Sequence, residues 1–359
     1  MLDSVKRCVP TSTNSVHVLG ALRRHRAACS MHRTLLVLLC IVCTAWVASA
    51  EPGVQQLPSS LLLPPEPVPR DAPILSGLVK HDPAALGLKP RAVLGYVSDK
   101  AWALLEFLAM MHASWRHLMA DPATGDVQLD IFAFTHPAWA EVLSNVCTVL
   151  DLDEEFRRRP SPTCYVIIYP VPPQHIWHGY PYINNVHFFA DERVASILTS
   201  HYGYVMKSDF DTYLTPALLR HTPSRLLFGI QEYGVLPETR ARLVRVADDL
   251  GFRHKGRHNL GPTWLGDAAT IIDMANRTIP VLHHILTQEF EQLPEGGIKQ
   301  RWLKGEGFPL WSAGMAAMYA TELIANHFIK HFDSTLLMDM HADSSLSVDE
   351  VRVGMTVPC

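Results

Sequence analysis

The feature that most constrains the fold of this chain is an alternation of short, continuously apolar segments with longer segments of helical periodicity. Five segments have the length and apolar character of buried strands: Arg91–Val97, Gln128–Phe134, Cys164–Tyr169, Tyr204–Met206 and Arg225–Gly229. Apolar residues spaced three and four apart predict helices between them: a helix from Ser98 as N-cap to Leu118, Pro137–Leu150 and Ala190–Tyr202. In the first of these helices the residues with that spacing, predicted to form its apolar face, are Trp102, Leu105, Leu108, Met111, Trp115 and Leu118. Strands that alternate with helices predict an α/β fold, with a mainly parallel mixed sheet, right-handed crossovers and helices on both faces.

The part of the chain beyond Gly234 is predicted to be mainly helical. Its periodic segments are Pro237–Leu250, Asp267–Leu286 and Ala313–His331, and a Gly- and Trp-rich loop, Leu303–Trp311, precedes the last of them. With 48% hydrophobic and 18% charged residues among 359, the chain has enough apolar material for one large α/β domain.

The N-terminal part is predicted to lie outside that domain. A basic segment, 1–33, leads into an apolar segment, 34–50, and then a Pro-rich linker, 51–80. The α/β domain is expected over 81–345 and a tail over 346–359.

The apolar segment 34–50 is typical of a signal for the secretory route, and two interpretations of it remain open. The small-x-small pattern Ala48-Ser-Ala50 favours a cleaved signal peptide and a secreted protein. The segment's full length and its basic flank favour an uncleaved signal anchor in the ER or Golgi membrane. Mitochondrial import is a third alternative. Both secretory interpretations place the chain after Glu51 in a lumenal or extracellular space.

Cysteines, a sequon and the charge balance bear on compartment and partners. Cys147 ends a predicted helix and Cys164 begins a predicted strand, so in an oxidising compartment they form either a disulfide or two buried thiols. Asn276-Arg-Thr278 is a glycosylation sequon in a helical stretch, used or unused. The net charge of −4 and the absence of a dense Lys/Arg stripe predict that the chain does not bind nucleic acid.

Two aspartates that follow a predicted strand are the candidate functional residues. The run Gly203-Tyr-Val-Met-Lys-Ser-Asp-Phe-Asp-Thr-Tyr-Leu-Thr-Pro216 places Asp209 and Asp211 beyond the strand's carboxyl end, where ligands of such sheets bind. Carboxylate oxygens are the ligands that Mg²⁺ and Mn²⁺ prefer. A second pair, Asp151 and Asp153, lies in an acidic stretch after a helix and is interpreted as part of a solvated connector.

The residues beside the pair have their own expected orientations. Phe210 is expected to point away from Asp209 and Asp211, because side chains alternate along an extended segment. Lys207 either adds positive charge beside phosphate groups or is a solvent-facing lysine at the strand end.

These residues resemble the GT-A fold glycosyltransferases, a group of nucleotide-diphospho-sugar transferases with a Rossmann-related α/β sheet. In that group a strand ends in Asp-x-Asp, and the carboxylates hold Mn²⁺ or Mg²⁺ on the donor diphosphate. The run Tyr202–Pro216 and the block Phe228-Gly-Ile-Gln-Glu-Tyr-Gly234 further resemble a eukaryotic membrane-anchored family of unknown function. The resemblance covers roughly Arg91–Asp343.

The resemblance implies a metal-dependent glycosyltransferase of the secretory pathway. It would transfer a sugar from a UDP- or GDP-sugar to a glycan, glycoprotein or glycolipid acceptor. Asp211 is the implied direct metal ligand, Asp209 would bind the donor ribose or the metal through water, and His341 is the implied third ligand downstream. Three acidic residues are candidates for the base that an inverting reaction requires: Glu306, Glu232 and Asp267.

The remaining histidines carry weaker expectations. His254, His258 and the pair His283-His284 are interpreted as surface or helix-capping residues. An aromatic and Asn-rich loop, Trp177–Asn185, either lines a sugar site through stacking and amide hydrogen bonds or is ordinary packing; its flanking histidines are His175, His178 and His187.

Two other functions remain open. One is a catalytically silent relative that binds a glycan or a partner, and the other is a metal-dependent hydrolase of nucleotide sugars or phosphoesters. No His-x-Asp or His-x-His pair lies near Asp209, which disfavours a two-metal phosphoesterase. The sequence also lacks a Gly-x-Ser-x-Gly elbow, which disfavours a serine hydrolase.

Overall fold

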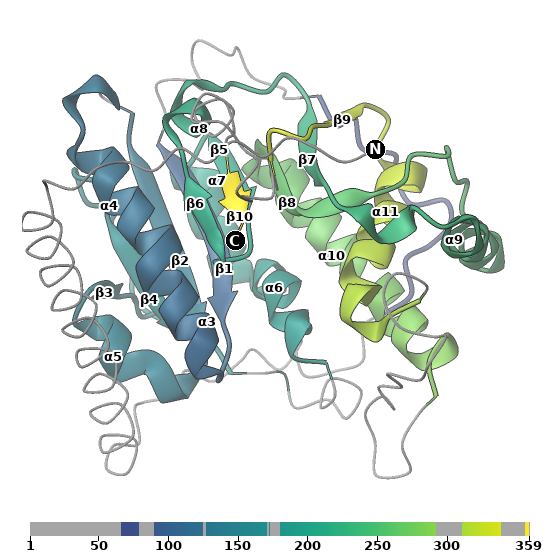
Figure 1. Cartoon of the computed structure of the whole chain (residues 1–359), viewed down its shortest axis with the longest axis horizontal. Coiled ribbons are helices and arrows are strands. Elements are labelled where there is room, and N and C mark those ends of the chain that lie inside the picture. Colours follow the sequence, from purple (N-terminus) through teal and green to yellow (C-terminus); the bar gives the residue numbers. More distant parts are fainter. Residues whose placement is uncertain are drawn as a thin grey trace, which may run out of the picture. The chain divides into compact units, whose positions relative to one another are not determined.

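The computed structural model of the chain describes residues 66–78, 90–124, 127–170, 172, 180–291, 311–338 and 356–358. An eight-stranded sheet runs through these residues in the order β3-β4-β2-β1-β5-β8-β7-β9 (Figure 1). Its strands are β1 (Arg91–Val97), β2 (Leu129–Thr135), β3 (Thr148–Val149), β4 (Cys164–Ile168), β5 (Tyr204–Lys207), β7 (Leu226–Ile230), β8 (Leu260–Asp267) and β9 (Phe332–Ser334). A separate antiparallel pair joins β6 (Thr212–Leu214) to β10 (Thr356–Pro358), so the expected tail 346–359 contains a strand.

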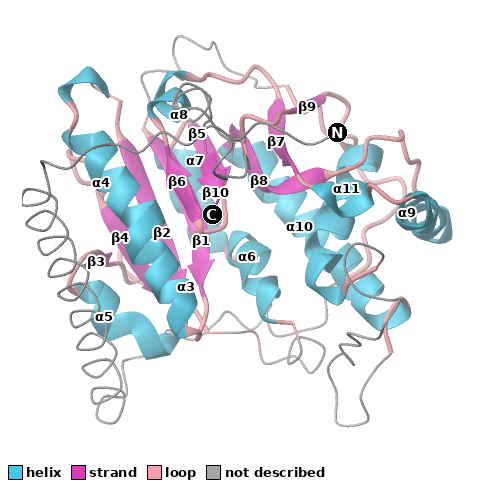
Figure 2. Ribbon diagram, in the orientation of Figure 1, coloured by secondary structure: helices cyan, strands magenta, loops and turns pink. Residues whose placement is uncertain are grey.

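Helices surround the sheet, as Figure 2 shows. They are α3 (Ala101–Glu106), α4 (Ala113–Ala120), α5 (Ala140–Ser144), α6 (Asn184–His187), α7 (Glu192–His201), α8 (Pro216–Arg220), α9 (Pro237–Leu250), α10 (Ala268–Gln288) and α11 (Ala316–Phe328). The predicted helices of the C-terminal part are confirmed as α9, α10 and α11.

Strand directions make the sheet mixed but mainly parallel. The run β3-β4-β2-β1-β5 is parallel throughout, and β7 and β9 are parallel to each other. Only β8 runs antiparallel to its neighbours, β5 and β7. The predicted α/β fold with a mainly parallel mixed sheet is therefore confirmed.

Two hydrophobic cores, one on each face of the sheet, hold the helices in place. Along β1, Ala92, Leu94 and Tyr96 belong to the core that contains α7, α10 and α11. Val93 and Val97 belong to the other core, with α3, α4 and α5. Because successive side chains of a strand point to opposite faces, an uninterrupted apolar strand requires helices on both faces.

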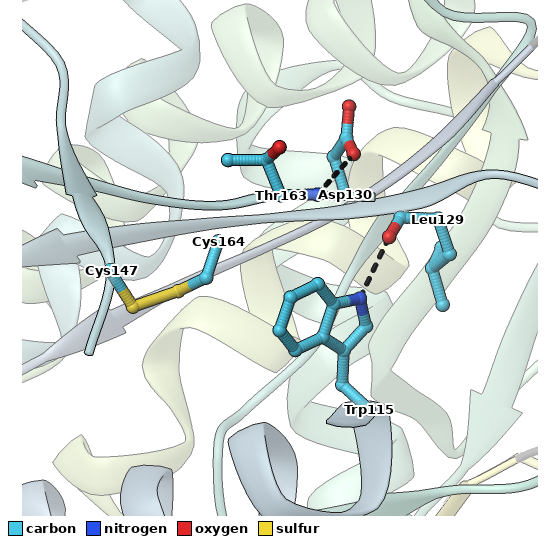
Figure 3. Close-up of a disulfide and its surroundings, with 6 residues drawn as sticks. All are labelled: Trp115, Leu129, Asp130, Cys147, Thr163 and Cys164. Carbon is cyan, nitrogen blue, oxygen red and sulfur yellow. Dashed lines mark hydrogen bonds between the residues drawn. A yellow bond between two sulfur atoms is a disulfide. The ribbon is translucent and has the colours of Figure 1, made fainter. Parts of the chain in front are cut away.

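The helix predicted over Pro137–Leu150 is wrong in its second half. A short 3₁₀ turn and α5 end at Ser144, and the chain then forms the edge strand β3 beside β4. Figure 3 shows the disulfide between Cys147 and Cys164 that joins the segment after α5 to the start of β4. The disulfide alternative is therefore confirmed, and this cross-link together with strand pairing outweighs the helical periodicity of the segment.

The helix expected after Ser98 begins later than predicted and is interrupted by a π-helical segment. α3 starts at Ala101, and the Ser98 hydroxyl accepts the Lys100 N–H at 3.4 Å instead of capping the helix. A π-helical segment, Phe107–His112, separates α3 from α4 and places Phe107 and Met111 in the core. Trp102, predicted on the apolar face, is 56% exposed.

Strand β8 has no counterpart among the predicted elements. It contains Gly261, Pro262 and Gly266, residues that are depleted in strand interiors. Its pairing with β7 shifts register between Phe228 and Ile230, and such irregularities accommodate a proline in a sheet. The short strand β9 also has no predicted counterpart, and α11 ends at Phe328 rather than at the predicted His331.

The basic segment 1–33, the apolar segment 34–50 and residues 51–65 and 79–80 of the expected linker lie outside the described residues. Residues 66–78 are described and pack against the sheet: Leu75 forms a bridge with Ile329, and Leu78 forms one with Arg225. The prediction that the linker lies outside the domain is therefore wrong for this part. In the part of the chain that the structure describes, no helix combines the length and apolar character needed to cross a membrane.

Candidate functional site

The two aspartates lie in a loop between β5 and β6, at the carboxyl end of β5. The Ser208 N–H donates to the Leu94 carbonyl at 2.9 Å, which ties the start of the loop to β1. Gly95 permits this approach, because a Cβ there would lie 2.6 Å from the Ser208 carbonyl oxygen. The loop therefore lies at the carboxyl ends of two neighbouring parallel strands, β1 and β5.

Side chains within the loop orient the aspartates outward. Phe210 is buried and packs on Phe107, with 4.9 Å between ring centroids, whereas Asp209 and Asp211 are partly exposed. The Thr212 hydroxyl donates to the Asp209 carbonyl at 2.9 Å and closes the turn. The expected opposition of Phe210 to the two carboxylates is thus present.

Two pockets that share lining residues open around this loop, and they are named here as the two lobes of one cleft. The lobe named here for Trp264 has a volume of about 380 Å³, and its walls include Lys207, Met315 and Thr321. The lobe named for Trp102 has a volume of about 250 Å³, and its walls include Lys100, Glu106 and Asp211. Three residues line both lobes: Tyr182, Asn185 and Asp209. Asp209 is therefore at the junction of the two lobes.

Polar contacts hold the Asp209 carboxylate in place at that junction. Asn185 Nδ2 donates to Asp209 Oδ1 at 3.1 Å, and Lys207 Nζ lies 3.8 Å from the same oxygen. Tyr182 and Asn185 come from the end of the aromatic and Asn-rich loop, so the described part of that loop does line the cleft. Residues 173–179 of the loop, including His175 and His178, are outside the described residues.

Lys207 is buried, so the alternative of a solvent-facing lysine is wrong. The residue is only 4% exposed, and its ammonium donates to the Pro262 carbonyl at 2.7 Å. It also lies over the Trp264 ring, 5.2 Å from the centroid. Strand β8 covers the end of β5 and forms this pocket for the lysine. A positive charge is consequently fixed beside Asp209 in the wall of the Trp264 lobe.

Glu106 is a cleft residue that sequence reasoning missed. It lines the Trp102 lobe, and burial, followed by the charge of Asp209, raises the pKa of its carboxyl. It lies one helical turn after Trp102, which is exposed in the same lobe. The sequence signal for this residue is an acidic side chain four positions after a tryptophan on a predicted helix. The prediction that Trp102 lies on the apolar face of that helix placed both residues away from a cleft.

The candidate bases are not brought together at the cleft. Asp267 ends β8 opposite Tyr204, at the amino end of β5, whereas the cleft lies at the carboxyl end. Its carboxylate caps α10 by accepting the Thr270 N–H and hydroxyl at 3.0 and 2.7 Å, so its role is that of a helix cap. Glu232 is exposed and is absent from both lobes within the described residues. Glu306 and His341 lie outside the described residues.

The second aspartate pair is a surface feature, as expected. Asp151 and Asp153 are both exposed, and Asp153 forms an ion pair with Arg193. Neither residue lines the cleft in the described part of the chain.

The interpretation of His254 and His258 as surface or capping residues is wrong. Both contact the fully buried carboxylate of Glu322, and the His254 side chain is only 3% exposed. His283 and His284 are half-buried on α10, and burial lowers the pKa of both. His187 is buried too, with Nδ1 lying 3.2 Å from the Tyr169 hydroxyl.

Hard oxygen donors characterise the cleft. Carboxylates of Asp209, Asp211 and Glu106 suit Mg²⁺ or Mn²⁺, which usually keep positions for water or phosphate oxygens. Only two groups of three His, Cys, Asp or Glu converge among the described residues, and both lie elsewhere: His112 with the disulfide cysteines, and His254-His258-Glu322. The cleft thus presents carboxylates of the type that such ions prefer, without a convergent group of three among the described residues.

Comparison with known proteins returns one family. A model described as "Domain of unknown function (DUF7164)" matches residues 88–353, which include every described residue of the cleft. No curated protein matches the chain.

Proposed function

The chain belongs to the DUF7164 family, and we propose that its two-lobed cleft is the donor site of a metal-dependent glycosyltransferase. The observation that carries this proposal is the position of Asp209 between the lobes, with Asp211 on one side and the buried Lys207 on the other. A nucleotide-sugar has the same order of parts, because its anionic diphosphate separates a nucleoside from a sugar.

The charges at the junction suit a diphosphate with a divalent cation. Asp211 and Asp209 would hold Mn²⁺ or Mg²⁺, and when bound the cation neutralises the diphosphate leaving group. Lys207 supplies a second positive charge whose position is fixed by Pro262 and Trp264. Asn185 orients Asp209 through Oδ1 and leaves the other carboxylate oxygen to face a cation.

The two lobes differ in ways that assign the parts of the donor. The Trp102 lobe lies at the carboxyl end of β1, where α/β proteins commonly bind nucleotides, and the exposed indole of Trp102 offers a stacking surface for a base. The Trp264 lobe would receive the sugar and the acceptor hydroxyl. Trp264 forms part of the wall of this lobe, beneath Lys207.

The disulfide supports the proposed compartment. Cys147–Cys164 fits an oxidising environment and hence a lumenal or secreted α/β domain. Segment 34–50 would either anchor the protein in the ER or Golgi membrane or be removed after Ala50. The proposed partners are a UDP- or GDP-sugar and a glycan, glycoprotein or glycolipid acceptor.

Metal-dependent nucleotide binding tests the donor site. The purified full-length chain is unfolded by heat with UDP or GDP, in the presence of Mn²⁺, Mg²⁺ or a chelator. A nucleotide at 100 times its Kd adds about 2.7 kcal/mol of stability, and we expect this only with the metal. The double variant Asp209→Asn/Asp211→Asn should lose the effect, whereas the matched control Asp151→Asn/Asp153→Asn should keep it.

Nucleotide binding that needs no metal, or that survives loss of Asp209 and Asp211, would contradict the proposed site. Turnover separates the alternatives that share the site. If UDP or GDP is released from a nucleotide-sugar only when a glycan acceptor is present, the protein is a transferase. If UDP or GDP is released without an acceptor, with water as the nucleophile, the protein is a hydrolase. Binding without release from any donor indicates a catalytically silent relative.

A further inference from the structure

The sequon Asn276-Arg-Thr278 lies in the middle of α10, away from the cleft. It is the one Asn-x-Ser/Thr sequence in the 359 residues. We propose that Asn276 carries an N-linked glycan, which is added in the lumen of the secretory pathway before α10 folds. This modification does not depend on glycosyltransferase activity, but it does rest on the lumenal compartment proposed above.

Asn276 lies at the centre of the solvent face of α10. Between residues 270 and 287 of this helix it is the one exposed residue, and Asp273 and Pro280 on the same face are partly exposed. The opposite face of the helix is buried in the core that also contains α7 and α11. The Asn276 amide forms no hydrogen bond within the described part of the chain. A sugar on Nδ2 therefore points to solvent and displaces no contact of the folded chain.

A glycan at this position is compatible with the proposed donor site and compartment. The described walls of the cleft contain no residue of α10, so the glycan leaves the cleft accessible. The disulfide between Cys147 and Cys164 fits the oxidising lumen in which such glycans are added.

The folded helix does not present the sequon as an acceptor. Thr278 is fully buried, and its hydroxyl donates to the Met274 carbonyl at 2.9 Å. With about 3.6 residues per turn, side chains two positions apart point ~200° apart around a helix. The Asn276 amide and the Thr278 hydroxyl therefore lie on opposite sides of α10. Because the hydroxyl defines the acceptor together with the amide, transfer requires this segment in an extended form.

Pro280 weakens the helix at the sequon until the helix is packed. Pro280 has no N–H to donate to the Asn276 carbonyl, four residues earlier, and its ring disfavours helical backbone at Ile279. Packing of the buried face must therefore stabilise α10, and much of that packing is against α11, which is synthesised later. The sequon consequently stays accessible in the emerging chain until residues 316–328 have entered the lumen.

The transfer is a substitution at the anomeric carbon of the incoming sugar. Asn276 Nδ2 forms a bond to this carbon of an oligosaccharide that is carried on a lipid diphosphate. The bond between the carbon and the diphosphate oxygen breaks, and the lipid diphosphate leaves with the electron pair. The amide loses one hydrogen as a proton. The lipid-linked oligosaccharide and its transferase are supplied by the cell.

Expression of the chain in cultured animal cells tests the site. We expect a single N-glycan that a peptide N-glycosidase removes, converting Asn276 to aspartate, which mass spectrometry locates. Asn276→Gln and Thr278→Val should both lose the glycan completely. The matched control Thr278→Ser, which keeps the hydroxyl, should keep the glycan. A glycan that survives Asn276→Gln, or an unmodified Asn276 in the secreted or lumenal protein, would overturn the proposal.

A second sequon distinguishes a wrong site from a wrong compartment. In the Asn276→Gln background, Asp151→Asn/Asp153→Thr introduces an Asn-Leu-Thr sequon into the exposed connector. If this variant is glycosylated and the unchanged chain is not, the site on α10 is wrong. If neither is glycosylated, both the site and the lumenal compartment are wrong. Metal-dependent nucleotide binding by the purified chain is measured separately, so the donor site can fail or succeed independently.

The order of transfer and folding has its own test. The chain is made in the bacterial periplasm, where disulfides form and this transfer is absent. With detergent-solubilised ER membranes, the folded chain should accept no oligosaccharide, whereas the same chain diluted from urea should accept one at Asn276. Equal transfer to the folded chain would show that glycosylation does not need to precede the folding of α10.

Discussion

Replacing Lys207 by methionine separates the two electrostatic roles of the cleft. The change keeps an unbranched side chain that lacks only the terminal ammonium, and so removes the charge that lies 3.8 Å from Asp209 Oδ1. That charge attracts a diphosphate and repels a cation bound at Asp209. We therefore expect Lys207→Met to weaken nucleotide binding without weakening the binding of Mn²⁺ alone.

The magnitude follows from the distance and the exposure of the site. Two unit charges about 4 Å apart interact with ~4 kcal/mol at an effective dielectric of ~20. Because the Asp209 side chain is 36% exposed, solvent screening reduces the contribution at this junction to about 1–2 kcal/mol. Since 1.4 kcal/mol corresponds to tenfold, UDP or GDP affinity in the presence of Mn²⁺ should fall about 5- to 30-fold.

Calorimetric titration measures both quantities on the same protein, first with Mn²⁺ alone and then with UDP or GDP at saturating Mn²⁺. Lys255→Met is the matched control. Lys255 also donates its ammonium to a backbone carbonyl, that of Ile329 at 2.6 Å, but is not part of the cleft. Its replacement should leave nucleotide affinity unchanged.

Either of two results would contradict the proposed role of Lys207. One is an unchanged nucleotide affinity in Lys207→Met, which would show that the buried charge does not face the ligand. The other is a parallel loss of Mn²⁺ and nucleotide affinity, which would indicate that the substitution distorts the aspartate loop.

Three further substitutions have expected effects of known direction. Replacing Cys147 and Cys164 by alanine should lower the free energy of unfolding in urea by about 3 kcal/mol, given 17 residues of separation; an unchanged midpoint would contradict this. Trp102→Ala should change stability by less than about 0.5 kcal/mol because the side chain is 56% exposed, but weaken UDP or GDP binding by about 1–3 kcal/mol; equal affinity would remove Trp102 from the donor site. Burial, and then the charge of Asp209, raise the pKa of the Glu106 carboxyl. The folded chain therefore binds the carboxyl proton more tightly than the unfolded chain, and the free energy of unfolding falls as the pH rises from the ordinary glutamate range through the raised pKa. In Glu106→Gln, the free energy of unfolding in urea should no longer show this decline across that pH range. A pH profile identical to that of the unchanged protein would contradict the raised pKa of Glu106.

The sheet was predictable because its central strands are buried on both faces. In Arg91–Val97 all seven residues are buried, and an uninterrupted apolar run is the signature of such a strand. The same reasoning located Asp209 and Asp211, because a carboxylate pair directly after a buried strand lies at the sheet's carboxyl edge. These inferences depend on local pattern alone.

The misses arise where distant segments decide the local structure. β8 contains Gly261, Pro262 and Gly266, and it forms a strand because β5 and β7 pair with it on both sides. Residues Thr148 and Val149 leave the predicted helix because β4 and a disulfide hold them. In both cases long-range pairing outweighs the local propensity of the segment.

The α/β class, the succession of apolar strands along the chain and the position of Asp209 and Asp211 after a buried strand could all be predicted from local sequence patterns. Which charged groups meet depends instead on the packing of distant segments. That packing buried Lys207 beneath β8, brought Glu106 beside Asp209, moved Asp267 to the opposite end of the sheet and joined His254 and His258 to Glu322. The physical reason is that periodicity along a chain reports which residues face the core, whereas the partner of a polar side chain depends on how segments far apart in sequence pack together.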